Sequence, residues 1–459
     1  MTAARFGTDG IRGVVGSSLT EADAANLGRA LAQRFPDAQV LVGRDTRPSG
    51  PALSAALVRA LRSGGASVID LGVLPTPGLA FLVMREPNIT LGVVVTASHN
   101  PVEYNGLKVI SRDGRKVADS IEREIEVLME STSGAISKGA TVDAPPDHDE
   151  RAALLRGHYI EHLREVAEEE VPGSGAAPLT ILVDAAHGAG SSYALDALAA
   201  TGATVKPLSA SVGVINDAVG ATNPAALAVA VRERGADAGI ALDGDADRCV
   251  VVDERGRPVD GDVLIALLAL DRQERRLAGA DRVVATVLTN TAIERRLTAA
   301  GISLVRTQVG DRHVAEELRR SGAGFGGEKS GHLLFPEHSP TGDGIMSAIH
   351  LVGLLVRSKQ PLSVLVQALP LDPQVQSSVA VGQAGAQGIL ENPEFIALVQ
   401  EQSVLLSAAG GRLVVRASGT EPLLRIMGEA PDATIVQQVV ERVAALASRL
   451  DRKSTRLNS

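Results

Sequence analysis

The sequence predicts an α/β protein in which three similar α/β domains with mixed sheets and a smaller α+β C-terminal domain surround a central cleft. Short runs of Val, Ile and Leu alternate with amphipathic helical stretches along most of the chain. One strand-and-loop pattern recurs three times, and the C-terminal part departs from the alternation. A chain of 459 residues also exceeds what one hydrophobic core holds, so several domains are expected.

The first elements illustrate the alternation. Strands are expected at 38–45, 66–72 and 91–98, with helices at 51–65 and near 76–84 between them. Continuous apolar strands followed by helices are typical of sheets that are covered on both faces. In such sheets the ligand-binding loops follow the carboxyl ends of the strands, so functional residues are expected there.

The C-terminal part has a different order of elements. A strand at 377–381 and a helix precede two further strands, at 412–417 and 423–430. A long closing helix is expected from Asp432 to about Arg449. The final KSTRLNS is polar and interrupts the amphipathic pattern, so it is expected to lie outside the fold.

Polar stretches that contain Gly and Pro mark the seams between domains, at 131–150, 253–262 and 369–378. The expected division of the chain is 1–150, 151–253 and 254–369 for the three α/β domains, 370–450 for the α+β domain, and 451–459 for a tail.

Composition excludes several classes of function. The chain has 45 Lys and Arg against 54 Asp and Glu, a net charge of -9, and no long basic run, which argues against a nucleic-acid partner. The one cysteine, Cys249, forms no internal disulfide and fits a reducing cytoplasm. No apolar run approaches bilayer length, and the N-terminus lacks the apolar core of a secretory signal. The oligomeric state, monomer or homodimer, stays open.

The recurring pattern places three polar loops at equivalent positions. Three short segments align on one glycine each, Gly92, Gly239 and Gly324. The residues six places further on are Ser98, Asp245 and Ser330. If the three units share one topology, these loops converge on one cleft.

Ser98 lies in the segment TASHNP, directly after a buried strand. On its own it is better explained as an ordinary turn serine. No GxSxG elbow is present, and the adjacent His99 is expected to point away from it, so a protease-type triad is disfavoured. Lys108 follows in YNGLKV, either as an acid/base or phosphate contact or as a solvated strand lysine.

The segment DGDADR carries Asp243, Asp245 and Asp247 at alternate positions after an apolar strand, which aims three carboxylates one way. Such crowding calls for a cation, and oxygen ligands beside phosphate chemistry favour Mg²⁺. An EF-hand-like calcium loop is the alternative, because Glu254 falls at the twelfth position. Arg248 at the sixth position, where that loop needs glycine, argues against it.

Two further loops offer groups that bind a phosphosugar. GEKSGH provides Glu328, Ser330 and the titratable His332, and it lacks the Gly-Lys pair of a nucleotide-binding P-loop. RASGTEPLLRI, between two expected strands, combines hydroxyls, backbone N–H groups and arginines suited to a phosphate, although a hairpin with incidental arginines is the competing interpretation. Its candidate residues are Arg416, Ser418, Gly419, Thr420 and Arg425. Arg12 lies on a similar Gly-flanked loop, FGTDGIRG.

These five motifs, in this order and at these separations, resemble the α-D-phosphohexomutase superfamily over nearly the whole chain, and most closely its bacterial phosphoglucosamine mutase branch. The resemblance implies that Ser98 carries the phosphoryl group and that this phosphate, together with Asp243, Asp245 and Asp247, holds Mg²⁺. It also implies catalytic roles for Arg12, Lys108 and Arg248, sugar contacts from Glu328, Ser330 and His332, and a grip on the distal phosphate by the 416–425 loop.

The implied reaction interconverts glucosamine 6-phosphate and glucosamine 1-phosphate through a hexosamine 1,6-bisphosphate, as a step toward amino-sugar nucleotides and cell-wall precursors. Lys329 stands where this branch usually has Gln, and Ala417 stands where Pro is common in the phosphate loop. Phosphomannomutase/phosphoglucomutase activity is therefore the alternative, since one loop difference can decide which C2 substituent fits. A sugar-phosphate-binding protein without catalysis is a further alternative.

Overall fold

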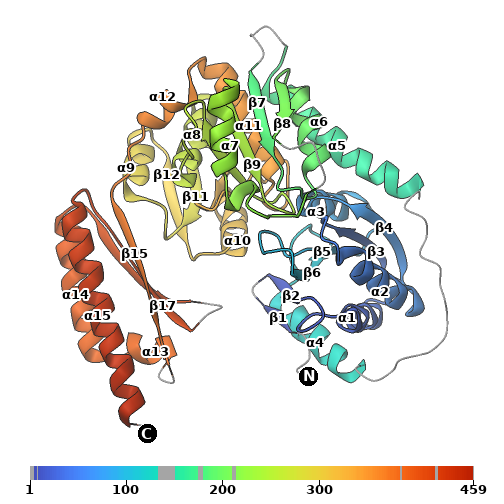
Figure 1. Cartoon of the computed structure of the whole chain (residues 1–459), viewed down its shortest axis with the longest axis horizontal. Helices are drawn as coiled ribbons and strands as arrows, with labels where there is room; N and C mark the ends of the chain where they lie inside the picture. Colours follow the sequence, from blue (N-terminus) through green and yellow to red (C-terminus); the bar gives the residue numbers. More distant parts are fainter. Residues whose placement is uncertain are drawn as a thin grey trace.

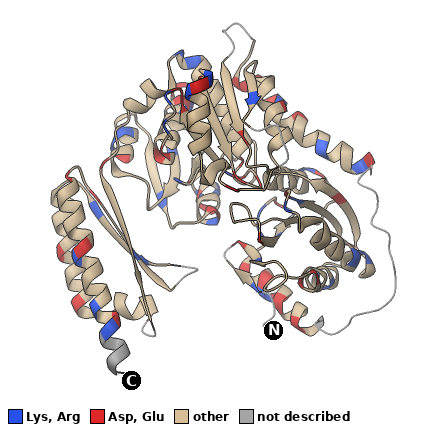
Figure 2. Cartoon of the chain, viewed as in Figure 1, with Lys and Arg blue, Asp and Glu red and all other residues tan. Residues whose placement is uncertain are grey.

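Four sheets lie along an arc, with the N-terminal and C-terminal domains at its two ends (Figure 1). The computed structural model describes residues 5–7, 9–132, 150–173, 179–208, 213–382, 385–418 and 422–457. Among these, no helix is both long and apolar enough to cross a membrane. Lys and Arg are interspersed with Asp and Glu along the helices (Figure 2).

The first domain is built on a six-stranded sheet of order β1-β2-β6-β5-β3-β4. Its strands are β1 (Phe6–Gly7), β2 (Gly10–Val14), β3 (Gln39–Arg44), β4 (Ser67–Val73), β5 (Leu91–Val95) and β6 (Tyr104–Ser111). Its helices are α1 (Glu21–Arg34), α2 (Gly50–Ser63), α3 (Thr76–Arg85) and α4 (Asp119–Thr132). Thr20 and Asp23 form a capping box that starts α1.

The second domain has a four-stranded sheet of order β10-β9-β7-β8. Its elements are α5 (Glu150–Glu170), β7 (Thr180–Asp184), α6 (Ser191–Ala200), β8 (Thr204–Pro207), the 3₁₀ turn η1 (Gly220–Thr222), α7 (Ala225–Arg234), β9 (Ala238–Leu242) and β10 (Cys249–Asp253).

The third domain has a four-stranded sheet of order β12-β11-β13-β14. Its elements are α8 (Gly261–Glu274), β11 (Arg282–Thr286), α9 (Thr291–Ala299), β12 (Ser303–Thr307), α10 (Asp311–Ser321), β13 (Gly326–Gly327), β14 (Leu333–Leu334), α11 (Gly344–Ser358) and α12 (Leu362–Gln367).

The three α/β domains share one wiring. In each, a central strand (β3, β7 or β11) has a parallel neighbour on both sides. One of these neighbours (β5, β9 or β13) then pairs with an antiparallel strand that follows it in the chain. This confirms the prediction of three similar α/β domains with mixed sheets.

The strand register corrects the third repeat of the sequence. Gly92 pairs with Leu41, and Gly239 pairs with Leu182, each partner being the third residue of its central strand. In the third sheet the residue in this position is Gly326, which pairs with Val284. The expected alignment through Gly324 is therefore two residues out of step. Six places after Gly326 comes His332 rather than Ser330, so His332 is the counterpart of Ser98 and Asp245.

The fourth domain has a three-stranded antiparallel sheet of order β15-β17-β16, which confirms the predicted α+β domain. Its elements are β15 (Gln374–Ala380), α13 (Gly385–Leu390), α14 (Pro393–Ala408), β16 (Arg412–Ala417), β17 (Leu423–Glu429) and α15 (Ala433–Leu457).

The closing helix is longer than the sequence pattern indicates. It continues to Leu457 instead of ending at about Arg449, so most of the expected tail, 451–459, is helical. No Gly or Pro interrupts this stretch. Asp451 also accepts a hydrogen bond from the backbone N–H of Gly382 at 2.6 Å, which ties the last turns to the end of β15.

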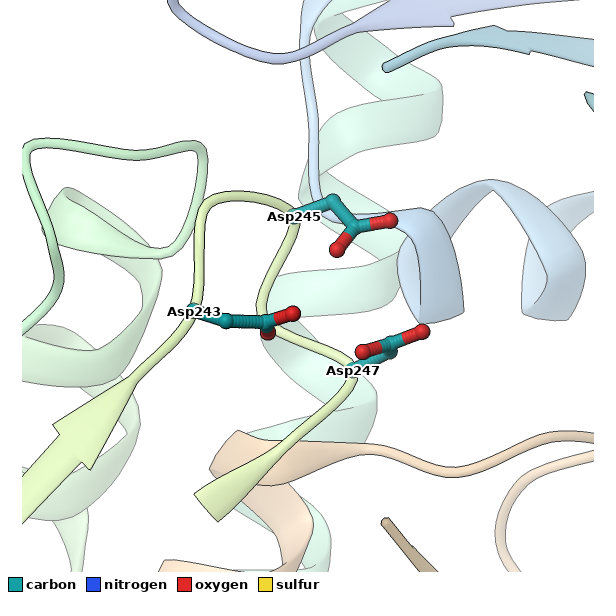
Figure 3. Close-up of side chains that lie close together, drawn as sticks. All are labelled: Asp243, Asp245 and Asp247. Carbon is teal, nitrogen blue, oxygen red and sulfur yellow. The ribbon is translucent and has the colours of Figure 1, made fainter. Parts of the chain in front are cut away.

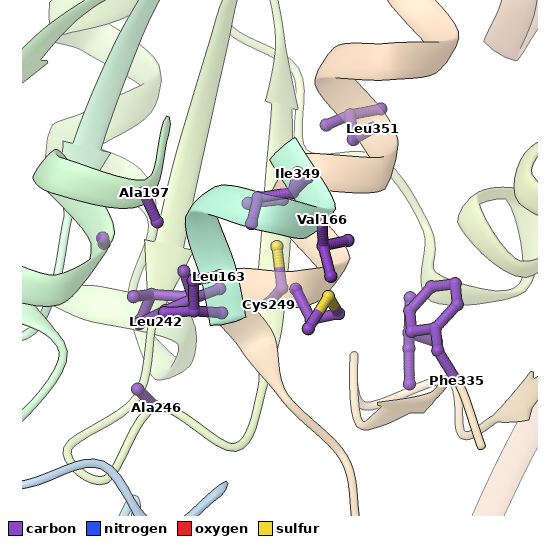
Figure 4. Close-up of a cluster of buried hydrophobic side chains, with 14 of the residues drawn as sticks. Leu163, Val166, Ala197, Leu242, Ala246, Cys249, Phe335, Ile349 and Leu351 are labelled. Atoms are coloured by element: carbon purple, nitrogen blue, oxygen red, sulfur yellow. The ribbon is translucent and has the colours of Figure 1, made fainter. Parts of the chain in front are cut away.

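Domains one to three share a continuous hydrophobic core, whereas the fourth domain has its own. Helix α11 runs through the shared core and packs against α5, α6, α8, β9, β10 and β14. Figure 4 shows Leu163 and Val166 of α5 and Ile349 and Leu351 of α11 in this core, together with Cys249. The three α/β domains are therefore one packed body, to which the fourth is joined separately.

Candidate active site

Three loops from three domains meet at one place. They are the loop after β5 with Ser98, the β9–β10 loop with the three aspartates, and the β13–β14 loop with His332. A Cβ atom on Gly244 would lie 2.7 Å from the carbonyl oxygen of Ser98, so the first two loops are in backbone contact. The backbone N–H of Cys249 donates to the carbonyl of Gly331 at 3.0 Å, which joins the third.

Ser98 is buried and strained. Its φ of 50° lies in the left-handed region, which non-glycine residues adopt rarely and at a cost of about 1–3 kcal/mol. Its Oγ donates to Oδ2 of Asp243 at 2.7 Å, and its N–H donates to Oγ1 of Thr96 at 2.9 Å. Nδ1 of His99 lies 3.3 Å from the same Oγ, contrary to the expectation that His99 points away, because the left-handed turn brings the two side chains together.

His99 is held neutral at this place. Burial, with the nearby cations Arg248 and Arg12, lowers the pKa of His99 to about 4. A neutral imidazole beside Ser98 leaves the hydroxyl paired with Asp243 without adding a charge.

A buried arginine that the sequence did not single out fixes the serine loop. Arg47 donates to the carbonyl oxygens of Ser98 at 3.0 Å and Asn100 at 2.7 Å, and also to those of Pro101 and Tyr104. It pairs with Asp45 at 3.0 Å, and neither side chain is exposed to solvent. Burial raises the pKa of Asp45 to about 6 even though Arg47 opposes this shift.

A second tie to the serine loop comes from the second domain. Nδ2 of Asn216 donates to the carbonyl oxygens of Ser98 at 2.8 Å and Asn100 at 3.1 Å. No motif in the sequence signals these anchors, because their partners are backbone carbonyls far away in the chain.

The three aspartates form a cluster of buried carboxylates. One oxygen from each of Asp243, Asp245 and Asp247 lies within 4.8 Å of the others, and the three side chains point toward one another (Figure 3). Oδ1 of Asp245 and Oδ1 of Asp247 are buried without a hydrogen-bond partner. Burial, together with the charges of Asp247 and Asp245, raises the pKa of Asp243. Buried carboxylates with unpaired oxygens fit a hard divalent cation.

The calcium-loop alternative does not fit this geometry. β9 and β10 pair antiparallel from Leu242 with Cys249 to Ala238 with Asp253, so Glu254 lies at the end of β10 remote from the aspartates. Its Oε2 accepts from the backbone N–H of Ser363 at 3.0 Å. Glu254 therefore cannot close a cation site with Asp243.

Lys108 reaches the aspartates from the first domain. Its Nζ lies 2.9 Å from Asp9, 3.6 Å from Asp245 and 3.8 Å from Asp247. Although burial alone would lower it, these carboxylates raise the pKa of Lys108 above its usual value. Arg12 forms an ion pair with Asp9 as well. Asp9 thus pairs with two of the predicted catalytic cations, and no sequence pattern distinguishes it from an ordinary aspartate of a Gly-rich turn.

Arg248 and His332 complete the charged shell around Asp247. Nε of Arg248 and Nδ1 of His332 each lie 3.8 Å from an oxygen of Asp247, an ion-pair distance rather than a hydrogen bond. Burial would lower the pKa of His332, but Asp247 and its neighbours raise it to about 9. His332 is consequently a cation at neutral pH, at the position that the strand register, rather than the predicted repeat, assigns to the third loop.

The other candidates on the third loop face different partners. Glu328 accepts through Oε1 from the backbone N–H of Gly310 at 2.9 Å. Ser330 is exposed at the tip of the loop. Nζ of Lys329 pairs with Asp260 at 3.0 Å.

The predicted phosphate loop belongs to the fourth domain and follows β16 in the chain, before β17. Arg416 and Arg425 are direct cross-strand partners. Partial burial and the charge of Arg425 lower the pKa of Arg416, which means that two like charges are held together. The N–H of Ser418 donates to the carbonyl of Leu423 at 2.8 Å, while Gly419 and Thr420 lie outside the described residues.

A cavity of about 590 Å³ adjoins this site between the first and third domains. Its lining includes Arg115, Lys116, Arg312 and Arg319, and His332 is the residue it shares with the aspartate cluster. Ser98 and the aspartates do not line it, so the cavity is a flank of the site rather than its centre.

Comparison with protein families covers the four domains in order. The phosphoglucomutase/phosphomannomutase models for alpha/beta/alpha domains I, II and III match residues 3–135, 157–256 and 260–371, and the model for the C-terminal domain matches 383–446. The chain belongs to the phosphoglucomutase/phosphomannomutase family. The phosphohexomutase resemblance of the sequence is thereby confirmed, and within this family the aspartate cluster is a place that could bind a metal.

Relatives within the phosphoglucomutase/phosphomannomutase family are similar over nearly their whole length. A phosphoglucosamine mutase of Heliobacterium modesticaldum is 41% identical, over 97% of this chain and 99% of its own. One of Rhodococcus erythropolis is 40% identical, over 96% of this chain and 98% of its own.

Two solved structures share the fold of this chain. A family protein from Burkholderia thailandensis has a TM-score of 0.76 at 23% identity and covers 98% of both chains. N-acetylphosphoglucosamine mutase of Aspergillus fumigatus, in complex with GlcNAc-6P and magnesium, has a TM-score of 0.62 at 19% identity, over 90% of this chain and 83% of its own.

Proposed function

We propose that this chain is a phosphoglucosamine mutase that works through a phosphoserine at Ser98. The proposal rests on Ser98. Its backbone is strained, and its buried hydroxyl lies 2.7 Å from a carboxylate of the aspartate cluster. Related chains about 40% identical over nearly their whole length are phosphoglucosamine mutases. A cytoplasmic location is part of the proposal and fits the free, buried thiol of Cys249.

The reaction proceeds in two phosphoryl transfers. Phosphoserine 98 gives its phosphoryl group to O1 of glucosamine 6-phosphate: the P–Oγ bond breaks, a P–O1 bond forms, and the proton of O1 passes to the released Oγ of Ser98. The resulting 1,6-bisphosphate turns over, and its 6-phosphoryl group passes to Oγ of Ser98: the P–O6 bond breaks, a P–Oγ bond forms, and the proton of Oγ passes to O6. Glucosamine 1-phosphate is then released, and the enzyme is again phosphorylated.

Asp243, Asp245 and Asp247 would hold Mg²⁺ together with an oxygen of the phosphoserine. The ion would supply positive charge beside the phosphoryl oxygens. The two unpaired buried oxygens, on Asp245 and Asp247, support this assignment. The Aspergillus fumigatus relative binds GlcNAc-6P and magnesium, which agrees with an oxygen-ligated ion beside a phosphosugar.

The chain's own cations surround the place of transfer. Lys108, which remains charged because of its raised pKa, Arg12 and Arg248 would stabilise the charge on the phosphoryl oxygens. His99 is neutral and lies 3.3 Å from Ser98 Oγ, so it is the group placed to take up a proton there.

The sugar and its far phosphate would be held by the third and fourth domains. Glu328, Ser330 and His332 would contact the sugar. The paired charges of Arg416 and Arg425, with Ser418, Gly419 and Thr420, would hold whichever phosphate is not reacting. Both phosphates must use this loop in turn, so the fourth domain must move between the two transfers. Its separate core supports such movement. Unchanged turnover after a rigid crosslink between domains one and four would contradict it.

The deciding experiment measures phosphoryl transfer to Ser98 and substrate choice together. Labelled phosphate from a hexose 1,6-bisphosphate should appear on the wild-type chain and on Ser63→Ala, whose serine is exposed on α2, but not on Ser98→Ala. Failure to label the wild type would favour a sugar-phosphate-binding protein without catalysis.

Turnover is then compared on glucosamine 1-phosphate, glucose 1-phosphate and mannose 1-phosphate with a bisphosphate primer. We expect the highest kcat/KM with the amino sugar. Phosphomannomutase/phosphoglucomutase activity is the second candidate. It is favoured by Lys329, which lies on the proposed sugar-contact loop and whose charge is paired with Asp260 at the start of α8. A higher kcat/KM with mannose or glucose phosphate would establish that alternative.

A further inference from the structure

Lys329 ties the sugar-reading loop, residues 327–332, to the start of α8. Its Nζ lies 3.0 Å from Asp260 and 3.8 Å from the fully buried Asp262. The backbones approach just as closely, since a Cβ atom on Gly261 would lie 2.0 Å from the carbonyl oxygen of Lys329. A displacement of this loop therefore acts directly on the first turn of α8.

Asp262 passes the contact to the start of α9. Its Oδ2 accepts from the backbone N–H of Asn290 at 3.0 Å. Asn290 is the N-cap of α9, because its Oδ1 accepts from the N–H of Ala292 at 3.0 Å. Asp262 and Asn290 are both buried, and buried polar contacts hold their partners in one arrangement.

Asn290 also holds the segment that leads into the fourth domain. Its Nδ2 donates to the carbonyl of Asp372 at 3.0 Å, and its Oδ1 accepts from the N–H of Asp372 at 3.2 Å. Asp372 lies two residues before β15, and its carboxylate pairs with Arg295 of α9 at 2.8 Å. Asn290 is thus bonded on one side to α8 and on the other to the domain joint.

The joint itself is polar. Glu429 of β17 is fully buried and accepts from the N–H of Thr291 at 3.1 Å, from Gln374 at 3.0 Å and from Arg412. Directional hydrogen bonds at a joint favour discrete positions rather than continuous sliding.

We propose that Lys329, Asp262 and Asn290 are positioning residues that couple the sugar-reading loop to the orientation of the fourth domain. The coupling keeps the bisphosphate enclosed while the fourth domain moves between the two phosphoryl transfers. This inference rests on the proposed function, because it takes residues 327–332 as the sugar contact.

Asn290→Asp cuts the path at the joint. The aspartate keeps the N-cap acceptor of α9 but replaces the Nδ2 donor to Asp372 with an oxygen, in a place already occupied by carboxylates. Asn392→Asp is the matched control, because Asn392 caps α14 with an acceptor bond to Glu394 at 2.9 Å and takes no part in the joint. Lys329→Met cuts the path at its other end.

The first readout is the amount of 1,6-bisphosphate released per turnover. We expect Asn290→Asp and Lys329→Met each to raise it about tenfold, a typical size for site coupling, and Asn290→Asp, which lies outside the sugar-contact loop, to change KM for glucosamine 6-phosphate less than twofold. The double variant should release no more than either single variant, because both cut one path. Unchanged release in the single variants, or additive effects in the double variant, would overturn the proposal.

The second readout needs no turnover. Arg59→Cys and Gln438→Cys lie on exposed positions of α2 and α15, and the native thiol is buried, so two dyes report the distance between the first and fourth domains. Glucosamine 6-phosphate should change energy transfer in the otherwise native chain and in Asn392→Asp, and much less in Asn290→Asp. An equal change in all three would contradict the coupling. Loss of Ser98 labelling in the native chain would instead reject the proposed mutase function and leave this distance test valid.

Discussion

Arg47→Met removes the guanidinium that holds the serine loop. In the native chain Arg47 donates to four backbone carbonyls of residues 98–104 and pairs with Asp45 at 3.0 Å. Methionine fills most of the same space but donates no hydrogen bond. The substitution therefore leaves the carboxylate of Asp45 buried beside Thr96 without its cation.

The magnitude follows from that unpaired charge. Removing one partner of a buried ion pair costs about 3–5 kcal/mol, and we expect a loss in this range. Thr96→Val removes two hydrogen bonds of the Thr96 hydroxyl, the one it donates to Asp45 at 2.7 Å and the one it accepts from the N–H of Ser98 at 2.9 Å. It should cost about 2–4.5 kcal/mol, the sum of a bond to a charged group and a bond between neutral groups. Adding Asp45→Asn to Arg47→Met should recover part of the loss, since the stranded charge is gone.

The assay exploits the absence of tryptophan from the chain. Phe35→Trp places one reporter in the first domain, so urea unfolding followed by its fluorescence reads this domain rather than an average over four. Arg59→Met, on the exposed face of α2, is the control and should change the free energy of unfolding by less than about 0.5 kcal/mol. If Arg47→Met lowers the free energy of unfolding by less than about 1 kcal/mol, the reasoning is refuted, because the Arg47 guanidinium would then not stabilise the serine loop.

Three further outcomes are expected. Asp245→Asn should weaken Mg²⁺ binding in calorimetry and lower turnover at least about a hundredfold, and full activity at low Mg²⁺ would contradict the metal assignment. The pKa of His332 is raised from 6.5 to about 9, so its stabilising contribution, about 3 kcal/mol, is complete below pH 6.5 and is lost as the pH rises through 9. Urea titrations of the chelated enzyme between pH 6 and 10 measure this pH dependence of the free energy of unfolding. If the native chain and His332→Gln show the same dependence, it does not come from His332. Gly244→Ala should cost about 1–3 kcal/mol and slow labelling of Ser98, whereas Gly157→Ala, in open space on α5, should be neutral or stabilising.

Periodicity and turn chemistry were enough to predict the four-domain fold. The alternation of apolar runs and helices indicated three α/β units, and the sheet orders agree. The recurring strand-and-loop pattern, aligned on one glycine in each segment, predicted that Ser98 and Asp245 occupy equivalent strand ends. It misplaced the third loop, because its alignment used Gly324, while the hydrogen-bond register places Gly326 at the equivalent position. Register is set by pairing between strands and is not encoded in one segment.

Residues that act through distant partners could not be found in the sequence. Arg47 binds carbonyls more than fifty positions away, and Asn216 reaches the same loop from another domain. Asp9 can be recognised as a site residue only in the folded structure, where it forms an ion pair with Lys108 at 2.9 Å. Chemically distinctive segments such as DGDADR were recognisable because their own residue spacing brings the carboxylates together.

Helix α11 has a consequence for how the chain is made. It packs against elements of the second and third domains at once, and the core that it shares reaches the first. The faces of α5 and α6 that it covers are synthesised more than a hundred residues before it. At about 5–20 residues per second, a nascent chain carries these apolar faces uncovered for roughly 10–40 s before α11 leaves the ribosome. Ribosome-bound fragments that end before residue 344 should therefore need a chaperone that the finished protein does not.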